Sequence, residues 1–271
     1  MYPYYETIST GEPYGFTIIF EENFTFPPHL HSHLELVYIL EGEVTVSIND
    51  IRRDLEKGDI AVCFPNDIHS YSSSAESKLM ILIFSQDIIR GYLSERTGKT
   101  LDYPFFEKGS FRDDINTLLD MIIAESAGDR NKYVVKGLLY TIFGKLDKIF
   151  VFKDGRQLQD TTIQKLLMYI GSHFSENITL DSIAKDLGFS KFHISRLFNS
   201  KIGEQFNDYV NKLRVNMAQS LLTGTDFSIS TIALECGFES IRNFNRVFKA
   251  YSSMTPKEFR IQFIERRHVH E

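Results

Sequence analysis

The deciding stretch of this chain is Ile183-Ala-Lys-Asp-Leu-Gly-Phe189, which returns 49 positions later as Ile232-Ala-Leu-Glu-Cys-Gly-Phe238. Beyond it, Arg196-Leu-Phe198 returns 50 positions later as Arg246-Val-Phe248, so the register slips by one residue. An internal repeat at this spacing indicates one supersecondary unit that is used twice.

Each copy predicts a short helix, a tight turn and a second helix, which is the arrangement of a helix-turn-helix motif. In the first copy, Thr179 is the expected N-cap of the first helix, and Ser190 opens the second helix. Gly188 and Gly237 provide the backbone freedom that a reversal of the chain needs. We expect the two motifs at about 179–201 and 229–251, joined by a helix over about 205–222.

The second helix of each copy is amphipathic, with an apolar stripe on one face and a polar row on another. Such a row suits a helix that enters the DNA major groove, where side chains contact base edges. The rows contain Phe192, Ser195 and Arg196 in the first copy, and Arg242, Asn245 and Arg246 in the second. One such pair of helices alone would favour a plain helical bundle with a solvated outer face, but the repeat favours DNA binding.

Four lysines lie near these rows and are candidates for phosphate contacts, which position a protein without reading sequence. They are Lys191, Lys201, Lys249 and Lys257. The net charge of the chain is −6, which by itself does not indicate a nucleic-acid partner. From Asp160 onward there are 14 Lys and Arg against 12 Asp and Glu, a net charge of +2, which leaves 16 against 24, net −8, before it. DNA affinity would therefore depend on the placement of the positive groups and on salt.

The stretch from Ile178 to Arg260 resembles the paired helix-turn-helix domain of the AraC/XylS family of bacterial transcription regulators. The matching segments are Ile183-Ala184, Gly188-Phe189-Ser190, Ser195 to Phe198, Ile232-Ala233, Gly237-Phe238, Phe244, Arg246 to Lys249 and Thr255-Pro256. In that family the third and sixth helices read bases, which implies this role for Phe192, Ser195, Arg196, Arg242, Asn243 and Arg246. The resemblance implies a sequence-specific regulator of transcription, more often an activator, with double-stranded DNA and RNA polymerase as candidate partners.

The first half of the chain changes to an apolar period of 2, which predicts short strands separated by turns. The expected strands are Thr17–Phe20, His33–Leu40, Val44–Ile48, Asp59–Phe64 and Lys78–Phe84. Several short strands at this spacing favour a β-sandwich or barrel. The run from His31 to Gly42, with Lys57-Gly58-Asp59 and Pro65 to His69, resembles the cupin-like sensor domain of the same family.

Histidines and a glutamate dominate this sensor motif. In an extended strand His29, His31, His33 and Glu35 would share one face, and His69 resembles the later cupin histidine. We expect His31, His33, Glu35 and His69 to bind a small molecule such as a sugar or organic metabolite, with ordinary strand positions as the alternative.

The same side-chain types can ligate transition metals. Metal-binding cupins usually place three or four residues between their second histidine and the glutamate, however, and here only Leu34 separates His33 from Glu35. We therefore expect no metal and no cofactor.

Two helices are expected between the halves, over 111–126 and 131–152. The broad apolar surface of the second predicts either packing on the subunit's own barrel or a homodimer formed with the same helix of a second subunit. Residues Met1 to Tyr5 belong to an arm that either folds over ligand or is frayed, and Lys153 to Asp160 have the composition of a linker. The predicted domains are a cupin-like sensor at 1–105, a helical connector at 106–159 and a DNA-binding domain at 160–271, an α+β multidomain chain.

The remaining features concern location and chemistry. Two cysteines, no signal peptide and no long apolar span predict a cytoplasmic protein without a membrane contact. No nucleophile constellation, phosphate-binding glycine loop or cysteine-pair zinc motif is found, so we expect no enzymatic activity. The alternatives are a metal-dependent cupin enzyme fused to a regulatory DNA-binding domain and a DNA-binding protein that ignores ligands.

Overall fold

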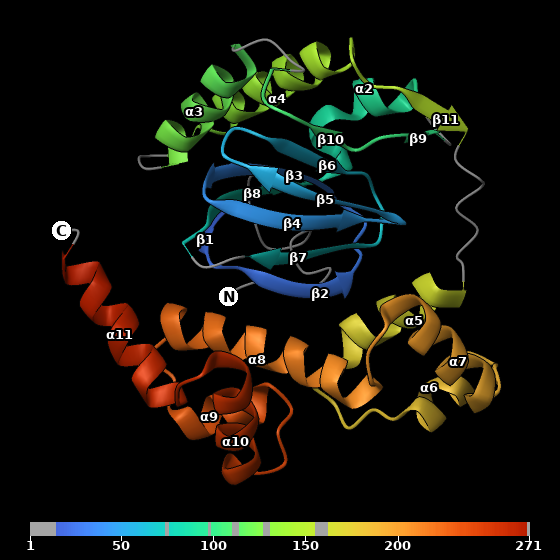
Figure 1. The fold of residues 1–271 in the computed structure, drawn as a ribbon, viewed down its shortest axis with the longest axis vertical. Coiled ribbons are helices and arrows are strands. Elements are labelled where there is room, and N and C mark those ends of the chain that lie inside the picture. The colour runs from blue at the N-terminus through green and yellow to red at the C-terminus, as the bar shows by residue number, and fades with distance from the viewer. Residues whose placement is uncertain are drawn as a thin grey trace. The chain divides into compact units, whose positions relative to one another are not determined.

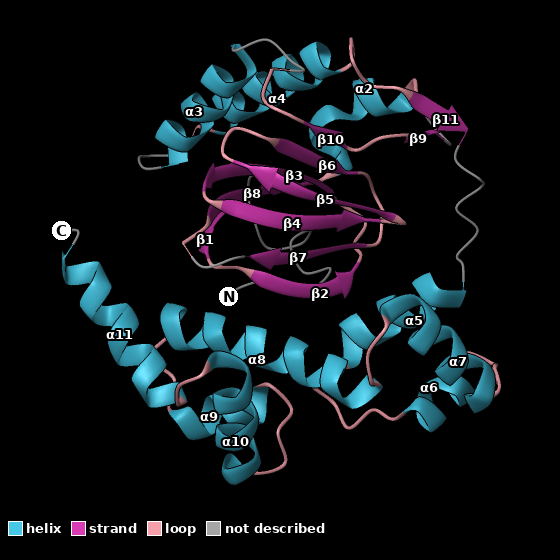
Figure 2. Ribbon diagram, viewed as in Figure 1, coloured by secondary structure: helices cyan, strands magenta, loops and turns pink. Residues whose placement is uncertain are grey.

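The computed structural model describes residues 15–73, 76–96, 99–109, 114–126, 131–154 and 162–269 (Figure 1). It divides into two compact units, one that ends at residue 161 and one that begins at Thr162. The first unit is rich in strands and the second is entirely helical, as Figure 2 shows. The N-terminal arm and residues 155–160 of the expected linker lie outside the described residues.

Two antiparallel sheets form the first unit. Its strands are β1 (Phe16–Glu22), β2 (Thr25–His29), β3 (Leu34–Glu41), β4 (Glu43–Ile48), β5 (Ile51–Glu56), β6 (Ile60–Cys63), β7 (His69–Ser73), β8 (Lys78–Phe84), β9 (Lys99–Leu101), β10 (Phe105–Phe106) and β11 (Phe152–Asp154). One sheet has the order β1-β8-β3-β6-β10 and the other the order β2-β7-β4-β5, while β9 pairs with β11. This is the cupin-like sandwich that the sequence predicts, although β2, β5 and β7 and the short β9, β10 and β11 are not among the predicted strands.

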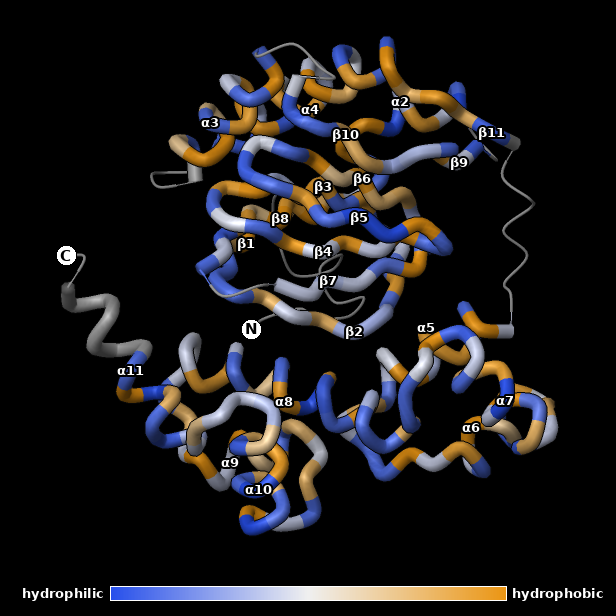
Figure 3. The backbone as a smooth tube through the Cα atoms, viewed as in Figure 1, coloured by the Kyte–Doolittle hydropathy of each residue, from blue (hydrophilic) through white to orange (hydrophobic). Residues whose placement is uncertain are grey.

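The central strand β3 directs alternate side chains to opposite faces. Leu34, Leu36 and Tyr38 belong to a core cluster that also contains the buried residues of the two connector helices. Glu35 therefore points the other way, and it meets Tyr71 of β7 in the opposing sheet. Figure 3 shows that hydrophobic residues dominate β3 and β8.

The connector helices α3 (Asp114–Ser126) and α4 (Lys132–Leu146) cover the outer face of the five-stranded sheet, while the short η1 (Gln86–Ile89) and α2 (Arg90–Ser94) follow β8. Leu139, Ile142 and Phe143 of α4 are fully buried in that contact. The broad apolar surface of α4 thus packs on the subunit's own barrel. Tyr133 and Tyr140 remain exposed on its other side.

The prediction that this second helix reaches residue 152 is wrong. The helix ends at Leu146, after which the chain turns through residues 147–149. Phe150 folds back into the core, and Phe152 pairs with Leu101 across β11 and β9. The apolar residues continue at nearly helical spacing because each still contacts the same core, but they do so from non-helical backbone.

The second unit consists of seven helices within residues 162–269. They are α5 (Thr162–His173), α6 (Leu180–Asp186), α7 (Lys191–Ile202), α8 (Phe206–Gly224), α9 (Ile229–Glu235), α10 (Ile241–Ser252) and α11 (Pro256–Val269). Their bounds follow the predicted repeat closely, with α8 as the joining helix. Across the described part of the chain, none of the helices combines the length and the apolar character that crossing a bilayer requires.

Candidate functional site

The first helix-turn-helix unit is built from α6 and α7. The Thr179 side chain accepts a hydrogen bond from Ser182 N at 3.1 Å, and the Ser182 hydroxyl lies 3.0 Å from Thr179 N, which caps α6 reciprocally. Ser190 caps α7 by accepting from His193 N at 3.2 Å. Gly188, between the helices, has a φ of +73°, a conformation that glycine adopts without steric cost. The predicted Thr179 cap and the predicted turn glycine are therefore present, and Ser190 opens α7 as predicted.

The second unit repeats this construction with α9 and α10. Ser228 and Ser240 cap the two helices by accepting from Thr231 N and Asn243 N, at 3.1 and 3.2 Å. Gly237 has a φ of +82°. Behind it, the fully buried Phe244 and Phe248 pack with Ile232 of α9 in one core. The inward stripe of α10 fixes which of its side chains face out.

The outward faces of α7 and α10 carry most of the base-reading candidates in exposed positions. Phe192 is 76% exposed. Arg196, Arg242, Asn245 and Arg246 are exposed as well, while Ser195 and Asn243 are half-buried. The Oδ1 atom of Asn243 accepts a hydrogen bond from Arg246 Nη2 at 2.9 Å, so this pair is oriented together on the surface of α10.

The four candidate phosphate-binding lysines are all exposed. Lys191 forms an ion pair with Asp181 of α6, with 2.5 Å between Nζ and Oδ2. Lys249 lies in the last turn of α10, and Lys257 lies in the first turn of α11. These positions are compatible with backbone contacts to DNA, but Lys191 has a competing carboxylate.

The two helix-turn-helix units are connected by side-chain and backbone contacts as well as by the α8 helix. Arg214 of α8 donates hydrogen bonds to the carbonyl oxygens of Phe174 and Glu176, at 2.7 and 2.8 Å, in the segment between α5 and α6. Gly237 closely approaches the same segment, because a Cβ atom placed on it would lie 2.3 Å from the carbonyl oxygen of Ser175. The turn of the second helix-turn-helix unit thus packs directly on the backbone that precedes α6 of the first.

The strand-rich compact unit, which ends at residue 161, holds a cluster of four buried side chains between its two sheets. They are His29 at the end of β2, His31 in the connection, Glu35 of β3 and His69 of β7, each no more than 8% exposed. One ligand-type atom of each lies within 4.8 Å of those of the other three. His31 Nε2 is 2.8 Å and His69 Nε2 is 3.5 Å from Glu35 Oε2.

His29 therefore takes the place that the sequence analysis gave to His33. His33 is buried, but it lies outside the group of four, and its Nδ1 has no hydrogen-bond partner within the described structure. The reason is that β2 ends at His29 and β3 begins at Leu34 in the other sheet, so residues 29–35 are not one strand. Among the clustered histidines, the one nearest to Glu35 along the chain is therefore His31, and three residues separate the two.

Burial and neighbouring charges shift the pKa values of the side chains in this cluster for different reasons. Burial opposes ionisation of Glu35, but His69 and His31 together hold the pKa of its carboxyl well below the usual value. Burial, reinforced by the neighbouring His69, lowers the pKa of His29. Tyr71 donates a hydrogen bond to Glu35 Oε1, and burial together with the Glu35 charge raises the pKa of the Tyr71 hydroxyl. The Glu35 carboxyl thus faces histidines in a fully buried position.

Sequence reasoning did not identify Tyr71 or Cys63 as neighbours of this cluster. Cys63 lies directly opposite Glu35 in the β3–β6 register, and Tyr71 follows His69 by two residues on the same face of β7. The alternation His69-Ser70-Tyr71 was the available signal.

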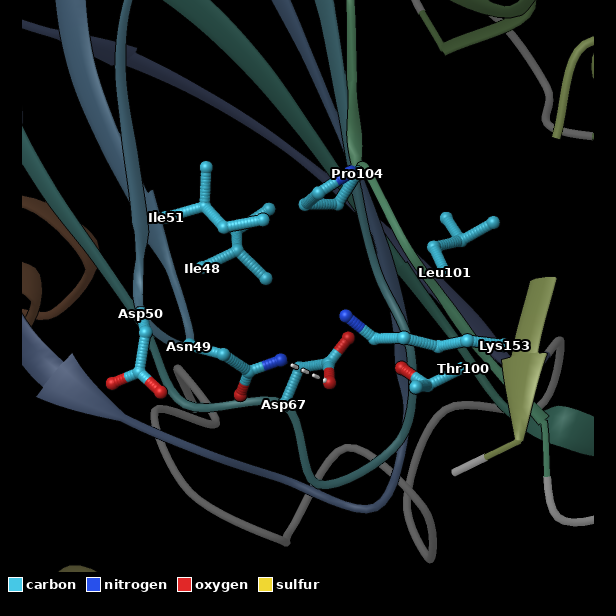
Figure 4. A pocket seen from close by; sticks show the side chains of 9 residues that line it. All are labelled: Ile48, Asn49, Asp50, Ile51, Asp67, Thr100, Leu101, Pro104 and Lys153. Atoms are coloured by element: carbon cyan, nitrogen blue, oxygen red, sulfur yellow. Dashed lines mark hydrogen bonds between the residues drawn. The ribbon is translucent and has the colours of Figure 1, made fainter. Parts of the chain in front are cut away.

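A small pocket of about 110 Å³ lies at one end of the sandwich (Figure 4). Polar side chains at its wall include Asn49, Asp67 and Lys153, and Asn49 donates a hydrogen bond to Asp67 Oδ1 at 2.8 Å. Burial raises the pKa of the Asp67 carboxyl. The carbonyl oxygen of Asp67 also lies 2.9 Å from His69 Nδ1, so one residue contacts both the pocket and the histidine cluster.

Two family models match the chain. A model described as an AraC-like ligand binding domain matches residues 13–143, and a helix-turn-helix domain model matches residues 183–262. The two matches fall in the sandwich with its connector helices and in the helical unit, respectively.

Two curated relatives align with part of the chain. An uncharacterized HTH-type transcriptional regulator of Staphylococcus aureus (strain COL) is 36% identical over 103 residues, which cover 38% of this chain and 14% of that protein. Regulatory protein PocR of Salmonella typhimurium is 35% identical over 109 residues, covering 40% of this chain and 36% of PocR. The chain thus matches well under half the length of either relative.

Solved structures of ToxT from Vibrio cholerae share the fold over nearly the whole chain. An apo form of a ToxT variant has a TM-score of 0.60 at 17% identity, covering 91% of this chain and 97% of that chain. A ToxT structure with an unsaturated fatty acid bound has a TM-score of 0.53 at 18% identity, covering 90% and 94%. At such identities the likeness concerns the arrangement of helices and strands.

Proposed function

Because this chain belongs to the AraC/XylS family of bacterial transcription regulators, we propose that it binds promoter DNA through α7 and α10 and that a small molecule bound by the sandwich changes this binding. The observation that carries the proposal is the pair of matching helices, each with an aligned outward row. Arginine on such a row can present two donors to guanine O6 and N7. Regulation then requires that the ligand prefers one arrangement of the chain over another.

We assign base contacts to the exposed rows of α7 and α10 and phosphate contacts to the surrounding lysines. Arg196 and Arg246 occupy matching positions of the repeat and are both exposed. Phe192, 76% exposed, suits an apolar contact with a thymine methyl group. Half-buried Asn243 acts by orienting Arg246, to which it is hydrogen-bonded.

The proposed effector is a small polar metabolite, such as a sugar or an organic acid. Support comes from the pocket in Figure 4, where Asn49 and Asp67 offer hydrogen-bonding groups and the Lys153 amine extends toward them. ToxT has been solved with an unsaturated fatty acid. Fatty acids are therefore the second class that a ligand panel should contain.

The first test is binding of the purified full chain to its own upstream intergenic DNA, at fixed physiological salt, with and without sugars, organic acids and fatty acids. We expect saturable binding that survives competitor DNA and that one compound shifts. Binding that no compound shifts would support a ligand-independent DNA-binding protein. Failure to bind any upstream fragment specifically would overturn the proposal.

Two substitutions sharpen this test. Arg196→Ala should change the base preference at one operator position, whereas Lys185→Ala removes the same charge from an exposed site on α6 and should change affinity alone. Equal base preference in the two variants would remove Arg196 from the base-reading set.

The direction of regulation follows from transcription in vitro. The family resemblance favours activation, with a homodimer as the acting species and RNA polymerase as its partner. Added protein should then raise transcript yield from the bound promoter, and sedimentation at the same concentration should give the mass of two chains. A fall in transcript yield would identify a repressor instead.

A further inference from the structure

The buried cluster of the sandwich has the composition of a metal site. Three imidazoles and one carboxylate, from His29, His31, His69 and Glu35, converge from β2, the following connection, β3 and β7. Burying a carboxyl group among hydrophobic strands is costly unless it has polar partners. The same four side chains are the types that bind divalent transition metals.

The spacing of the ligand atoms fits a single ion. Bonds of about 2.0–2.2 Å from one ion place its ligand atoms roughly 3.0–4.4 Å apart. In the cluster all four atoms lie within 4.8 Å of one another, and His69 Nε2 is 3.5 Å from Glu35 Oε2. Movements of up to about 1 Å in the most distant pair would therefore bring all four within bonding distance of one ion.

The outer contacts of the histidines prepare them as ligands. The Nδ1 atoms of His29, His31 and His69 lie 3.0, 3.2 and 2.9 Å from the backbone carbonyl oxygens of Pro27, His33 and Asp67. A hydrogen on each Nδ1 satisfies these contacts and directs the lone pair of Nε2 into the cluster. Such backbone carbonyls are the partners that fix ring orientation in metal sites.

Two further observations favour a bound ion over a cluster held by hydrogen bonds alone. His69 is 1% exposed, yet its Nε2 has no hydrogen-bond partner within the described structure. A buried polar atom without a partner is costly. Glu35 uses Oε1 to accept the Tyr71 hydroxyl, which leaves Oε2 as the oxygen that faces the histidines.

We propose that the sandwich binds one divalent transition-metal ion through Nε2 of His29, His31 and His69 and Oε2 of Glu35. The imidazoles exclude Ca²⁺ and Mg²⁺ as preferred ions, since these cations select oxygen ligands. Zn²⁺ would complete a four-coordinate site, whereas Fe²⁺, Co²⁺ or Ni²⁺ would keep positions for a further ligand. The assignment concerns the sandwich alone and does not depend on the proposed DNA binding.

The test begins with the full chain stripped by a chelator and dialysed against Zn²⁺, Co²⁺, Ni²⁺, Mn²⁺ or, without oxygen, Fe²⁺. Elemental analysis after removal of free ion should give one tightly held ion per chain for at least one of these metals. Visible absorption of the Co²⁺ form then reports its coordination by nitrogen and oxygen. A chain that retains no ion of any of the five metals overturns the proposal.

Three variants locate the ion. His69→Gln and Glu35→Gln should each weaken binding by about 100-fold or more, beyond the 10- to 100-fold effect of outer-shell changes. The glutamine in Glu35→Gln can still accept from Tyr71 and keeps the side-chain volume, so the fold should persist. His33→Gln is the matched control, because His33 is equally buried and adjacent in sequence but outside the cluster.

Thermal unfolding separates lost ligands from lost structure. An ion that binds only the folded chain raises the melting temperature. The metal should raise it in the unaltered chain and in His33→Gln, and should leave it unchanged in Glu35→Gln. If all three proteins bind and respond to the metal alike, the ion lies elsewhere and the assignment fails.

Discussion

Gly188 and Gly237 occupy the same place in the two helix-turn-helix units, and their φ angles are nearly equal, +73° and +82°. Their surroundings differ. A Cβ atom on Gly188 would meet no other atom within 4 Å, whereas one on Gly237 would lie within 3 Å of three backbone atoms of Ser175. The repeat thus preserves the turn in both units but gives the second turn an additional contact.

This difference shows that the two units are not equivalent copies. The segment around Ser175 is bonded by Arg214 and closely approached by Gly237. The turn of the first helix-turn-helix unit, at Gly188, is exposed. The turn of the second, at Gly237, packs against the segment between α5 and α6, which precedes the first helix-turn-helix unit. The second unit should therefore be the more sensitive of the two to changes in its turn.

The largest expected effect is on stability. Gly188→Ala introduces only the cost of a left-handed backbone for alanine, about 1–2 kcal/mol. Gly237→Ala adds a collision with backbone that cannot move aside cheaply, so we expect a loss of about 4 kcal/mol or more. Hydrogen exchange of the α6 and α9 amides in the full chain measures the free energy of opening of each unit. Equal losses in the two variants would contradict the inequivalence of the turns.

The next effect concerns base contacts. Arg246 is oriented by Asn243, so Arg246→Ala should cost about 1–3 kcal/mol of specific binding and relax one operator position. Asn243→Ala should cost less, because it loosens the arginine without removing it. Competitive binding to operators randomised at single positions compares the two variants with Arg196→Ala. A larger loss for Asn243→Ala than for Arg246→Ala would show that asparagine itself contacts a base.

A third prediction uses the cysteine of the second turn. Burial raises the pKa of Cys236 to about 12, whereas the first unit has Leu187 at this position. Since the folded chain holds the thiol protonated, its contribution is complete below the unfolded pKa near 9 and declines as pH rises toward 12. At pH 10 the loss should be about 1.4 kcal/mol.

Urea unfolding of the unaltered chain and of Cys236→Ala at pH 7.5 and pH 10 measures this contribution. The unaltered chain should lose more stability between the two pH values than the variant, in which other alkaline titrations are unchanged. Parallel losses would mean that the thiol ionises without unfolding the second unit.

The smallest effect is electrostatic. Asp181 pairs with Lys191 in the first helix-turn-helix unit, and the equivalent positions of the second are Ser230, 49 residues later, and Ile241, 50 residues later. Asp181→Asn should free Lys191 and strengthen DNA binding by about 0.2–1 kcal/mol at low salt, with the gain lost as salt rises. Asp226→Asn removes an equal charge from an exposed site without an adjacent paired lysine, and it is the control. An equal gain in the control would reduce the effect to net charge.

The helical half of the fold was predictable because its signals are local. Thr179 and Ser190 cap the helices that follow them, and the apolar stripe of α10 places Phe244 and Phe248 inside. Polar edge strands gave no such signal. β5, with the sequence Ile-Arg-Arg-Asp-Leu-Glu, has three consecutive exposed residues, and β2 contains two prolines.

Contacts between distant segments were the part that sequence could not supply. The spacing of His29, His31 and His33 is the same along the chain, and only the passage from β2 in one sheet to β3 in the other separates His33 from the cluster. Likewise, Gly237 looks in sequence like a second Gly188. Its approach to Ser175 depends on how α5 and α9 are brought together by α8.

The contact of Gly237 with Ser175 also limits which duplexes the chain can match. One helix-turn-helix unit cannot turn about α8 without separating these two backbones. B-DNA rotates by about 34–36° with each base pair. A single base pair inserted between the two halves of an operator would present the second half at a different angle, and five would present the opposite side of the duplex. Under the proposed DNA binding, affinity therefore depends on the helical phase of the operator as well as on its bases.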